Sequence, residues 1–301
     1  MEEQNYHVPV LLLDSVNGLN IDPDGVYVDV TFGGGGHSRE ILTKLKEGRL
    51  FGFDQDPDAA NNTPDDPRFT LIPQNFRYMA NFLRMYGVNE VNGILADLGV
   101  SSHQFDVPDR GFSIRFDAPL DMRMSQNGER TAATILNTSP PEDLRRILQQ
   151  YGEVRGAGRV VQRILEFREE QPFETTGDLI KVLSPLVPPL KQHKFQAQVF
   201  QALRIEVNDE LGALKELLKQ SERILKPGGR LSIISYHSLE DRMVKRFLRA
   251  GNFEGEVKKD FYGNPITPFK LITRSAITAT EEEVNQNSRA RSARLRIAER
   301  L

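Results

Sequence analysis

Short apolar segments alternate with amphipathic helical patterns along the first third of this chain. Each segment has the length and apolar character of a buried strand, and between them apolar residues recur at helical spacing. The predicted strands are residues 26–30, 50–54, 69–72 and 93–97. Strands that alternate with helices are typical of a parallel sheet covered by helices on its faces. The pattern therefore predicts an α/β fold.

The alternation stops after Asp97. Residues 98–106 read as a loop, and the segment from about 110 to 204 has helical patterns, punctuated by prolines, without a convincing buried strand. This break predicts an inserted, mainly helical domain.

The α/β pattern resumes with a long helix predicted over 207–225, which Lys226-Pro227-Gly228-Gly229-Arg230 ends. The remaining predicted strands are residues 231–235, 269–272 and 293–298. We therefore predict a mostly parallel, seven-stranded sheet. The predicted division is a core of residues 1–108 and 207–301, with residues 109–206 inserted as a helical substrate-recognition domain.

A glycine-rich loop follows the first predicted strand, in Thr31-Phe32-Gly33-Gly34-Gly35-Gly36-His37, and Ser38 can cap the next helix. Glycine lets the backbone approach a ligand closely and adopt positive φ without steric cost. In open α/β sheets, ligands bind at the carboxyl ends of the strands beside the first strand. We therefore interpret these glycines as a ligand-binding loop and not as an ordinary turn.

Asp54 ends the second predicted strand, about 20 residues after the loop, where such folds place the acid that binds both ribose hydroxyls. Loop and acid together indicate an adenosine-containing cofactor. The Lys226–Arg230 turn and Asp97, at the end of the fourth strand, are like those of class I S-adenosylmethionine-dependent methyltransferases, which are Rossmann-like. The loop fits G-x-G-x-x-G spacing poorly, so a nicotinamide or flavin enzyme is the alternative.

Composition narrows the classes of protein. With 39% hydrophobic and 27% charged residues, the 301-residue chain has the composition of a soluble globular protein. Having no cysteine, it has no disulfide, thiolate metal site or cysteine nucleophile, and we predict no metal site. No apolar run approaches the roughly 18 residues of a membrane helix, and the N-terminus is acidic. We expect a cytoplasmic protein without a membrane partner.

Net charge gives no support to nucleic-acid binding, because the formal value is -3 and such binders usually have a basic excess. Arginines gather locally between Arg289 and Arg300. The simplest interpretation of this tail is a strand with one solvated face.

Beyond these patterns, the chain resembles the ribosomal RNA small subunit methyltransferase H (MraW) family over nearly its whole length. The matching blocks are His7-Val8-Pro9-Val10-Leu11-Leu12, Asp29 through Ser38, Asp97-Leu98-Gly99-Val100-Ser101-Ser102, Arg110-Gly111-Phe112-Ser113, Pro119 through Met124, Phe200 through Ile205 with Val207-Asn208, Ser235 through Arg242 and Ser288 through Ser292. Two positions depart from the family: Gly34, where a basic residue is frequent, and Val154, where Glu is usual.

The resemblance implies an enzyme that transfers a methyl group from S-adenosylmethionine to N4 of cytidine 1402 of 16S rRNA, in the decoding region of the small ribosomal subunit. DNA is not an expected partner. The cofactor-binding residues that the resemblance implies are Gly35, Gly36, His37, Asp54, Phe76, Asp97 and Gln104.

For catalysis, a cytosine amine must be aligned with the methyl group, because its lone pair is delocalised into the ring. An acceptor beside the amine would favour the developing positive charge and take its proton. Asp97 is the first candidate, although it would equally suit a contact with only the methionine end of the cofactor. His237 is a second candidate. Tyr236 is placed to stack on a flipped base, with simple packing as the alternative.

Three other charged residues, Asp121, Arg123 and Arg204, are expected to tie the insertion to the core or to contact phosphate, without a catalytic role. Other classes of protein stay open at this point. A small-molecule or protein methyltransferase would share the core but not need the insertion, and a nonenzymatic ribosome-assembly factor would tolerate loss of Asp54.

Overall fold

The computed structural model describes residues 9–301, apart from the side chain of Ser102. His7 and Val8, from the first matching block, lie outside the described residues. The chain divides into two compact units, which are described separately: residues up to Gly99 with Leu211–Leu301, and Val100–Glu210.

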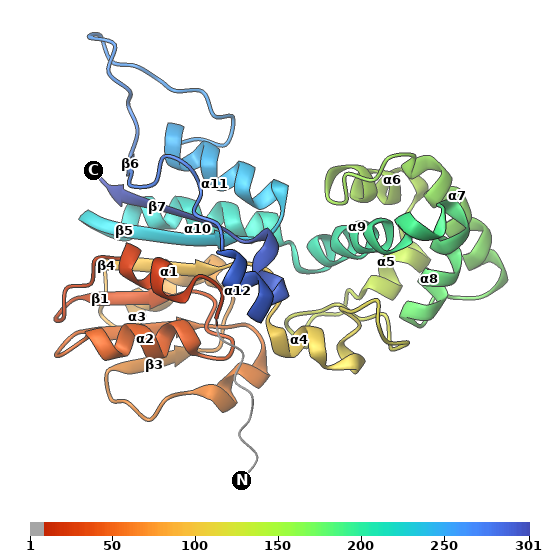
Figure 1. Ribbon diagram of the computed structural model, residues 1–301, viewed down its shortest axis with the longest axis horizontal. Helices are drawn as coiled ribbons and strands as arrows, with labels where there is room; N and C mark the ends of the chain where they lie inside the picture. Colours follow the sequence, from red (N-terminus) through yellow and green to blue (C-terminus); the bar gives the residue numbers. More distant parts are fainter. Residues whose placement is uncertain (1–8) are drawn as a thin grey trace. The chain divides into compact units, whose positions relative to one another are not determined.

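One seven-stranded sheet, in the order β3-β2-β1-β4-β5-β7-β6, forms the centre of the first unit (Figure 1). Its strands are β1 (Val26–Asp29), β2 (Arg49–Phe53), β3 (Phe69–Ile72), β4 (Val91–Asp97), β5 (Leu225–Ser235), β6 (Phe269–Leu271) and β7 (Arg294–Arg300). Neighbours among β1 to β5 pair in parallel, whereas β7 runs antiparallel to β5 and β6. The predicted mostly parallel, seven-stranded sheet is confirmed.

Helices cover both faces of this sheet. The helices of this unit are α1 (Leu12–Gly18), α2 (Gly36–Lys44), α3 (Met79–Met85), α10 (Glu210–Ile224, apart from its first residue), α11 (Ser238–Ala250) and α12 (Glu281–Gln286). Side chains that alternate along each strand enter different apolar clusters, so that Val28 packs with α3, α10 and α11 while its neighbour Tyr27 packs with α1 and α2. Burial on both faces explains why the strands read as continuous apolar runs.

The strand after the Lys226–Arg230 turn was predicted to begin at residue 231, which is wrong. β5 begins at Leu225, which pairs with Val91, and the pairing then jumps to Gly93 with Arg230. The turn is therefore an irregularity inside the strand, with Gly228 at φ 81°. The predicted helix over 207–225 is also wrong at its start, because Asp209 is left-handed at φ 46° and separates α10 from the preceding helix.

The second unit is helical and has its own apolar core. Its helices are α4 (Ser102–Asp106), α5 (Ala132–Thr138), α6 (Pro141–Gln150), α7 (Ala157–Glu170), α8 (Thr176–Leu183) and α9 (Pro189–Asn208). The expectation that residues 98–106 form only a loop is wrong, because Ser101 caps α4 in a reciprocal arrangement with Gln104. The boundaries of the unit, Val100 and Glu210, differ from the predicted 109 and 206 because α4 and the end of α9 cluster with it.

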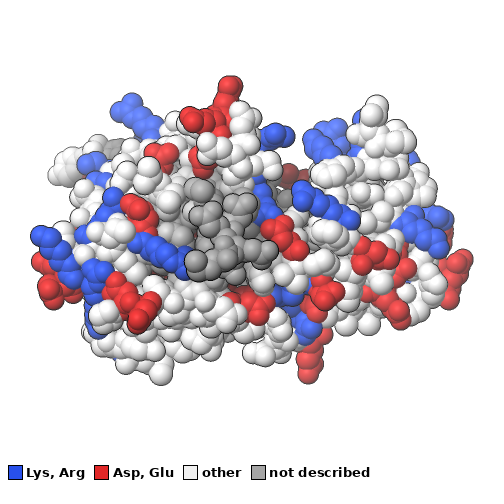
Figure 2. All heavy atoms as spheres, turned by 60° about the horizontal axis from the view of Figure 1, so that its bottom comes forward, with Lys and Arg blue, Asp and Glu red and all other residues white. Residues whose placement is uncertain are grey.

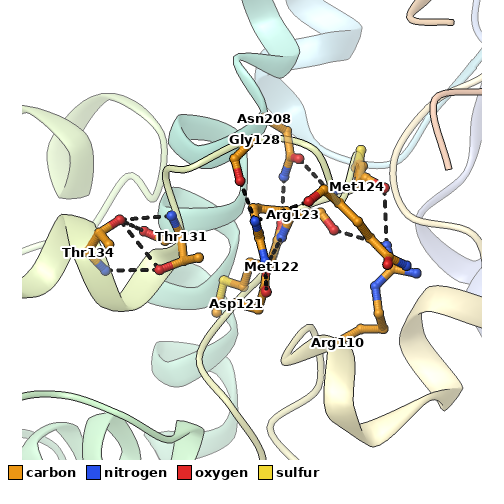
Figure 3. Close-up of polar contacts among 10 residues, drawn as sticks. Arg110, Asp121, Met122, Arg123, Met124, Gly128, Thr131, Thr134 and Asn208 are labelled. Atoms are coloured by element: carbon orange, nitrogen blue, oxygen red, sulfur yellow. Dashed lines mark hydrogen bonds and ion pairs between the residues drawn. The ribbon is translucent and has the colours of Figure 1, made fainter.

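Figure 3 shows how the loop before α5 is held within this unit. Met122 has a left-handed backbone at φ 63°, and Asn208 both accepts the N–H of Met124 and donates to the carbonyl of Met122. Asp121 binds the guanidinium of Arg123 at 2.7 Å, and despite its burial this partner holds the pKa of Asp121 below its usual value. These two charges therefore fasten the unit's own loop.

Arg204 also has a partner inside the unit, since its guanidinium makes two hydrogen bonds to Glu210, at 2.8 and 3.0 Å. Like Asp121 and Arg123, it has a structural role here, and phosphate contact by any of the three stays a prediction.

Only the second part of the arginine tail, Arg294–Arg300, is the strand β7, because residues 288–292 form a 3-10 helix. The prediction that the strand presents one solvated face is wrong for Arg296. This side chain is 9% exposed, and it binds Asp241 of α11 through two hydrogen bonds of 2.7 and 3.2 Å. Arg294 reaches the same carboxylate at 3.4 Å. The arginine is buried because α11 lies over this part of the sheet and supplies the opposite charge.

Replacing Asp241 with Asn should therefore destabilise the protein by about 3 kcal/mol, because a buried guanidinium would lose its counter-charge. Chemical denaturation of the full chain measures the change. Glu299→Gln, which removes the partly exposed partner of Arg230 at 3.3 Å, is the matched control and should cost no more than about 1 kcal/mol. Equal losses in the two variants would contradict the buried-pair argument.

Within residues 9–301, the structure has no helix that combines the length and apolar character needed to cross a membrane.

Candidate active site

The glycine loop lies at the carboxyl end of β1 and leads directly into α2. Gly35 has φ 74°, and a Cβ on it would come within 2.9 Å of the Phe32 ring. A Cβ on Gly36 would collide with the ring of Pro9. Gly34, by contrast, faces open space, so the backbone does not require glycine there. The backbone therefore requires glycine at 35 and 36, two of the predicted cofactor contacts.

Two side chains hold the loop from the side. Arg39 donates to the carbonyl of Gly34 at 2.7 Å, and Asn62 donates to the carbonyl of Gly33 at 3.0 Å. The first-turn N–H groups of a helix lack intrahelical acceptors, so the start of α2 presents donors at the loop. A carboxylate is the type of group that such a helix start accommodates.

Asp54 follows β2 and faces the same loop. One carboxylate oxygen accepts the N–H of Gly33 at 2.7 Å, and the other accepts the N–H of Asp56 at 2.8 Å. Burial raises its pKa to about 6, against the effect of these hydrogen bonds. Each oxygen keeps a second lone pair, so the fixed carboxylate can accept two hydroxyl hydrogen bonds, as a ribose requires.

Phe76 lies in the turn after β3, half-buried against the sheet's core. The preceding residue, Asn75, donates from its side chain to Gln55, next to Asp54, at 2.8 Å. This bond fastens the turn of Phe76 to the loop of Asp54. An aromatic ring beside a ribose acceptor is well suited to pack against an adenine.

Asp97 ends β4 and forms the centre of a polar cluster. One of its oxygens accepts the hydroxyl of Tyr236, which follows β5, at 2.7 Å. The other lies 4.0 Å from Nδ1 of His37. Burial raises the pKa of Asp97 to about 6, and burial together with Asp97 raises that of Tyr236 well above its usual value. The tyrosine therefore stays a hydroxyl donor that orients the carboxylate.

The contacts of His37 indicate its tautomer. Its Nε2 lies 3.2 Å from the carbonyl of Val10, which can only accept, so Nε2 carries the proton. Burial lowers the pKa of His37 although Asp97 is nearby, and the neutral ring leaves Nδ1 as an acceptor. Nδ1 and the carboxylate of Asp97 thus form a pair of acceptors that suits a cationic amino group, such as that of a methionine moiety.

Sequence reasoning missed the part played by Asp29. This residue is fully buried and accepts hydrogen bonds from Ser38 Oγ at 2.7 Å and from the N–H of Thr31 at 3.1 Å. Thr31 Oγ1 in turn accepts the N–H of Asp97 at 2.6 Å. Asp29 therefore holds Thr31, which in turn positions Asp97. The available signal was an acid inside an otherwise apolar strand.

His237 and Gln104, two further predicted site residues, have capping roles. His237 Nδ1 accepts the backbone N–H of Glu240 at the start of α11. His237 Nε2 lies 3.2 Å from the carboxylate oxygen Oε1 of Glu240. Gln104 is buried in the second unit, and its side-chain oxygen accepts the N–H of Ser101 at 3.1 Å. A catalytic role for His237 and a cofactor contact for Gln104 stay predictions.

Comparison with known proteins identifies the family. The sequence matches the MraW methylase family over residues 4–301. The chain belongs to this family. The ribosomal RNA small subunit methyltransferase H of Cytophaga hutchinsonii is 60% identical over 297 residues, which cover 98% of this chain and 99% of that protein. The protein of the same name from Parabacteroides distasonis is 56% identical over 305 residues, the whole of both chains.

Among solved structures, an rRNA methylase from Streptococcus thermophilus is similar, with 12% identity and a TM-score of 0.41 over 98% of this chain and 99% of that chain. The family assignment rests on the sequence relatives.

The chain is therefore an S-adenosylmethionine-dependent methyltransferase, and the nicotinamide or flavin alternative is wrong. Its residues fit this cofactor. Asp54 has free lone pairs for a ribose, and the loop of Gly35 and Gly36, where a Cβ would collide with Phe32 and Pro9, leads directly into the start of α2. His37 and Asp97 supply acceptors for an ammonium group. Each individual contact with the cofactor remains a proposal.

Proposed function

We propose that this enzyme methylates N4 of cytidine 1402 in 16S rRNA of the small ribosomal subunit. The observation that carries the proposal is the 60% identity to a ribosomal RNA small subunit methyltransferase H, which extends over 98% of this chain and 99% of that protein. Identity at this level over nearly all of both chains leaves almost no part of the relative without a counterpart here. The name of the relative supports small-subunit ribosomal RNA as the substrate class, and N4 of cytidine 1402 is the target that the resemblance to the family implies.

The arrangement around Asp97 suits methylation of an exocyclic amine. When bound, S-adenosylmethionine supplies an electrophilic methyl group on a sulfonium. The amine nitrogen would accept this methyl group as the carbon–sulfur bond breaks, S-adenosylhomocysteine would leave, and the methylated nitrogen would have one proton to lose. Asp97 accepts a hydrogen bond from the amine, which favours the charge that develops on nitrogen, and takes that proton.

Tyr236 is a positioning residue in this scheme. Its hydroxyl occupies one oxygen of Asp97 at 2.7 Å, so the carboxylate has a fixed orientation before the substrate arrives. The ring was expected to stack on a flipped base. Its hydrogen bond to Asp97 gives Tyr236 a part in the reaction that does not require stacking.

A pH dependence follows from the raised pKa of Asp97, about 6. Above this pH the carboxylate is ionised and can accept the proton of the amine. Below it the rate of methyl transfer should fall by up to about tenfold per pH unit. Single-turnover rates at saturating cofactor and subunits, from pH 8 to pH 5, measure this loss, since saturation removes the effect of Asp54 on cofactor affinity. The residual rate of Asp97→Asn should lose the dependence. A wild-type rate that stays constant to pH 5 would contradict the assignment.

The helical unit, predicted as residues 109–206, is proposed to recognise the RNA around the target. It has a core separate from that of the sheet, and Arg145, Arg155 and Arg159 are exposed on α6, α7 and the turn between them. These cations are suited to phosphate contacts.

Methyl transfer to alternative acceptors tests the proposed substrate class. The purified enzyme is incubated with labelled S-adenosylmethionine and either small subunits from cells that lack the protein, deproteinised 16S rRNA, or total protein from those cells. We expect label in the RNA of the subunits. Label in protein only, or in neither RNA sample, would contradict the proposal while leaving the methyltransferase fold intact.

A further inference from the structure

The segment between α11 and β6 forms a hairpin that reaches out beyond the sheet (Figure 1). At its tip Phe261 is 96% exposed and Tyr262 is 85% exposed. Their rings lie 5.5 Å apart and nearly perpendicular, at 88°. Neither ring belongs to an apolar cluster of the described residues. Two adjacent exposed aromatic rings indicate a binding site, because large apolar groups that lie together on a surface are usually covered by a partner.

The tip is a turn that hydrogen bonds hold in place. The carboxylate of Asp260 accepts the N–H groups of Tyr262 and Asn264 at 2.9 and 2.8 Å, and Asn264 also donates from its side chain. Gly263 supplies the positive φ, 88°, that this turn needs. The two rings are therefore displayed by a fixed backbone, which lowers the entropic cost of binding through them.

The base of the hairpin is anchored in the core. Phe253 stacks on Phe247 of α11, with centroids 5.0 Å apart, and Phe247 also contacts Phe269 of β6. Asn252 accepts the N–H of Gly255 at 2.7 Å and donates to Glu256. A partner held at the tip is thereby connected to the sheet that carries the active site.

Cations are placed next to the rings at the tip of the hairpin. The exposed Lys258 and Lys259 directly precede Asp260, whose carboxylate is committed to the turn, while the exposed acids Glu254 and Glu256 lie nearer the base. Elsewhere on the surface drawn in Figure 2, Lys and Arg lie intermixed with Asp and Glu, without a broad basic face. Aromatic rings with adjacent lysines are typical of sites where unpaired bases stack and phosphates lie alongside.

We propose that Phe261 and Tyr262 stack on unpaired bases of small-subunit RNA outside the target nucleotide, with Lys258 and Lys259 on the adjoining phosphates. This inference rests on the proposed function for the identity of the RNA. The hairpin thus adds an RNA contact from the sheet-bearing unit.

The test compares wild type with the double variant Phe261→Ala, Tyr262→Ala in methyl transfer to small subunits. We expect KM for the subunits to rise at least about 30-fold, since two base–ring stacks are lost and each contributes about fivefold or more to affinity, while kcat is unchanged. The affinity for S-adenosylmethionine should not change. Phe261→Trp with Tyr262→Phe keeps two stacking rings and should restore KM. Met85→Ala, which removes a 78% exposed apolar side chain from α3, is the matched control.

An unchanged KM in the alanine variant would overturn the proposal. A second outcome would also overturn the proposal: the alanine variant binds small subunits weakly but binds deproteinised 16S rRNA as tightly as wild type does. The rings would then contact a ribosomal protein. If wild type itself methylates no rRNA, the proposed function fails separately. In that case, binding of a fluorescent single-stranded RNA of mixed sequence is compared between wild type and the alanine variant. Weaker binding by the variant still supports the hairpin as an RNA site, and equal binding overturns it.

Discussion

Replacing Asp97 with alanine should reduce the single-turnover rate of methyl transfer by at least about 100-fold, because a positioned acceptor contributes 10²–10⁴-fold to such reactions. The carboxylate at the end of β4 is partly buried, and its orientation is fixed by the Tyr236 hydroxyl at 2.7 Å. The variant removes the acceptor and leaves that hydroxyl without its partner. Rapid-quench measurement with saturating cofactor and small subunits gives the rate of the chemical step.

The same variant separates the two roles open to Asp97. If the residue serves the reaction, cofactor affinity measured by calorimetry should fall much less than the rate. If it contacts only the methionine end of S-adenosylmethionine, affinity should fall and saturating cofactor should restore turnover. Tyr236→Phe is the companion variant, since it keeps the ring and removes only the hydroxyl. A normal rate for Asp97→Ala at saturation would exclude the residue from the mechanism.

The second large effect is expected at Asp54. Replacing it with alanine should weaken S-adenosylmethionine binding by at least about 100-fold, because two hydrogen bonds to a charged acceptor are lost at 1.5–3 kcal/mol each. The variant also releases the N–H of Gly33, which the carboxylate holds at 2.7 Å. Calorimetric titration with S-adenosylmethionine measures the affinity.

Asp65→Ala is the matched control, since Asp65 is an exposed acid in the loop before β3. It should bind the cofactor as wild type does. Thermal unfolding of both variants without cofactor shows whether the fold is intact. Unchanged affinity in a folded Asp54→Ala variant would remove Asp54 from the cofactor site.

Much of the fold was predictable because its signals are local. Strands buried on both faces read as apolar runs, and glycines mark the loop after β1. The errors fall where tertiary contacts decide. Four residues that look like a turn, Lys226–Gly229, lie within β5 because Val91 pairs with the strand before them. Arg296 looks like a solvated residue, but Asp241 of α11 neutralises it in the interior.

The candidate site was predictable as a set of positions but not as a set of contacts. Asp54 and Asp97 stood out because acids at the ends of strands meet at one edge of a sheet. The hydrogen bond between Tyr236 and Asp97 joins residues 139 apart in sequence, and no local pattern indicates it. The support of Asp97 through Asp29 and Thr31 likewise depends on the register of β1 against β4.

Nucleoside mass spectrometry gives the most direct test of the proposed reaction. Small subunits from cells lacking this protein are incubated with the enzyme and isotopically labelled S-adenosylmethionine, and the 16S rRNA is cut into defined fragments before analysis. We predict labelled N4-methylated cytidine at a single position, 1402, which is absent with Asp97→Ala. Label at another atom or another position, or no label although the cofactor binds, would contradict the proposed function.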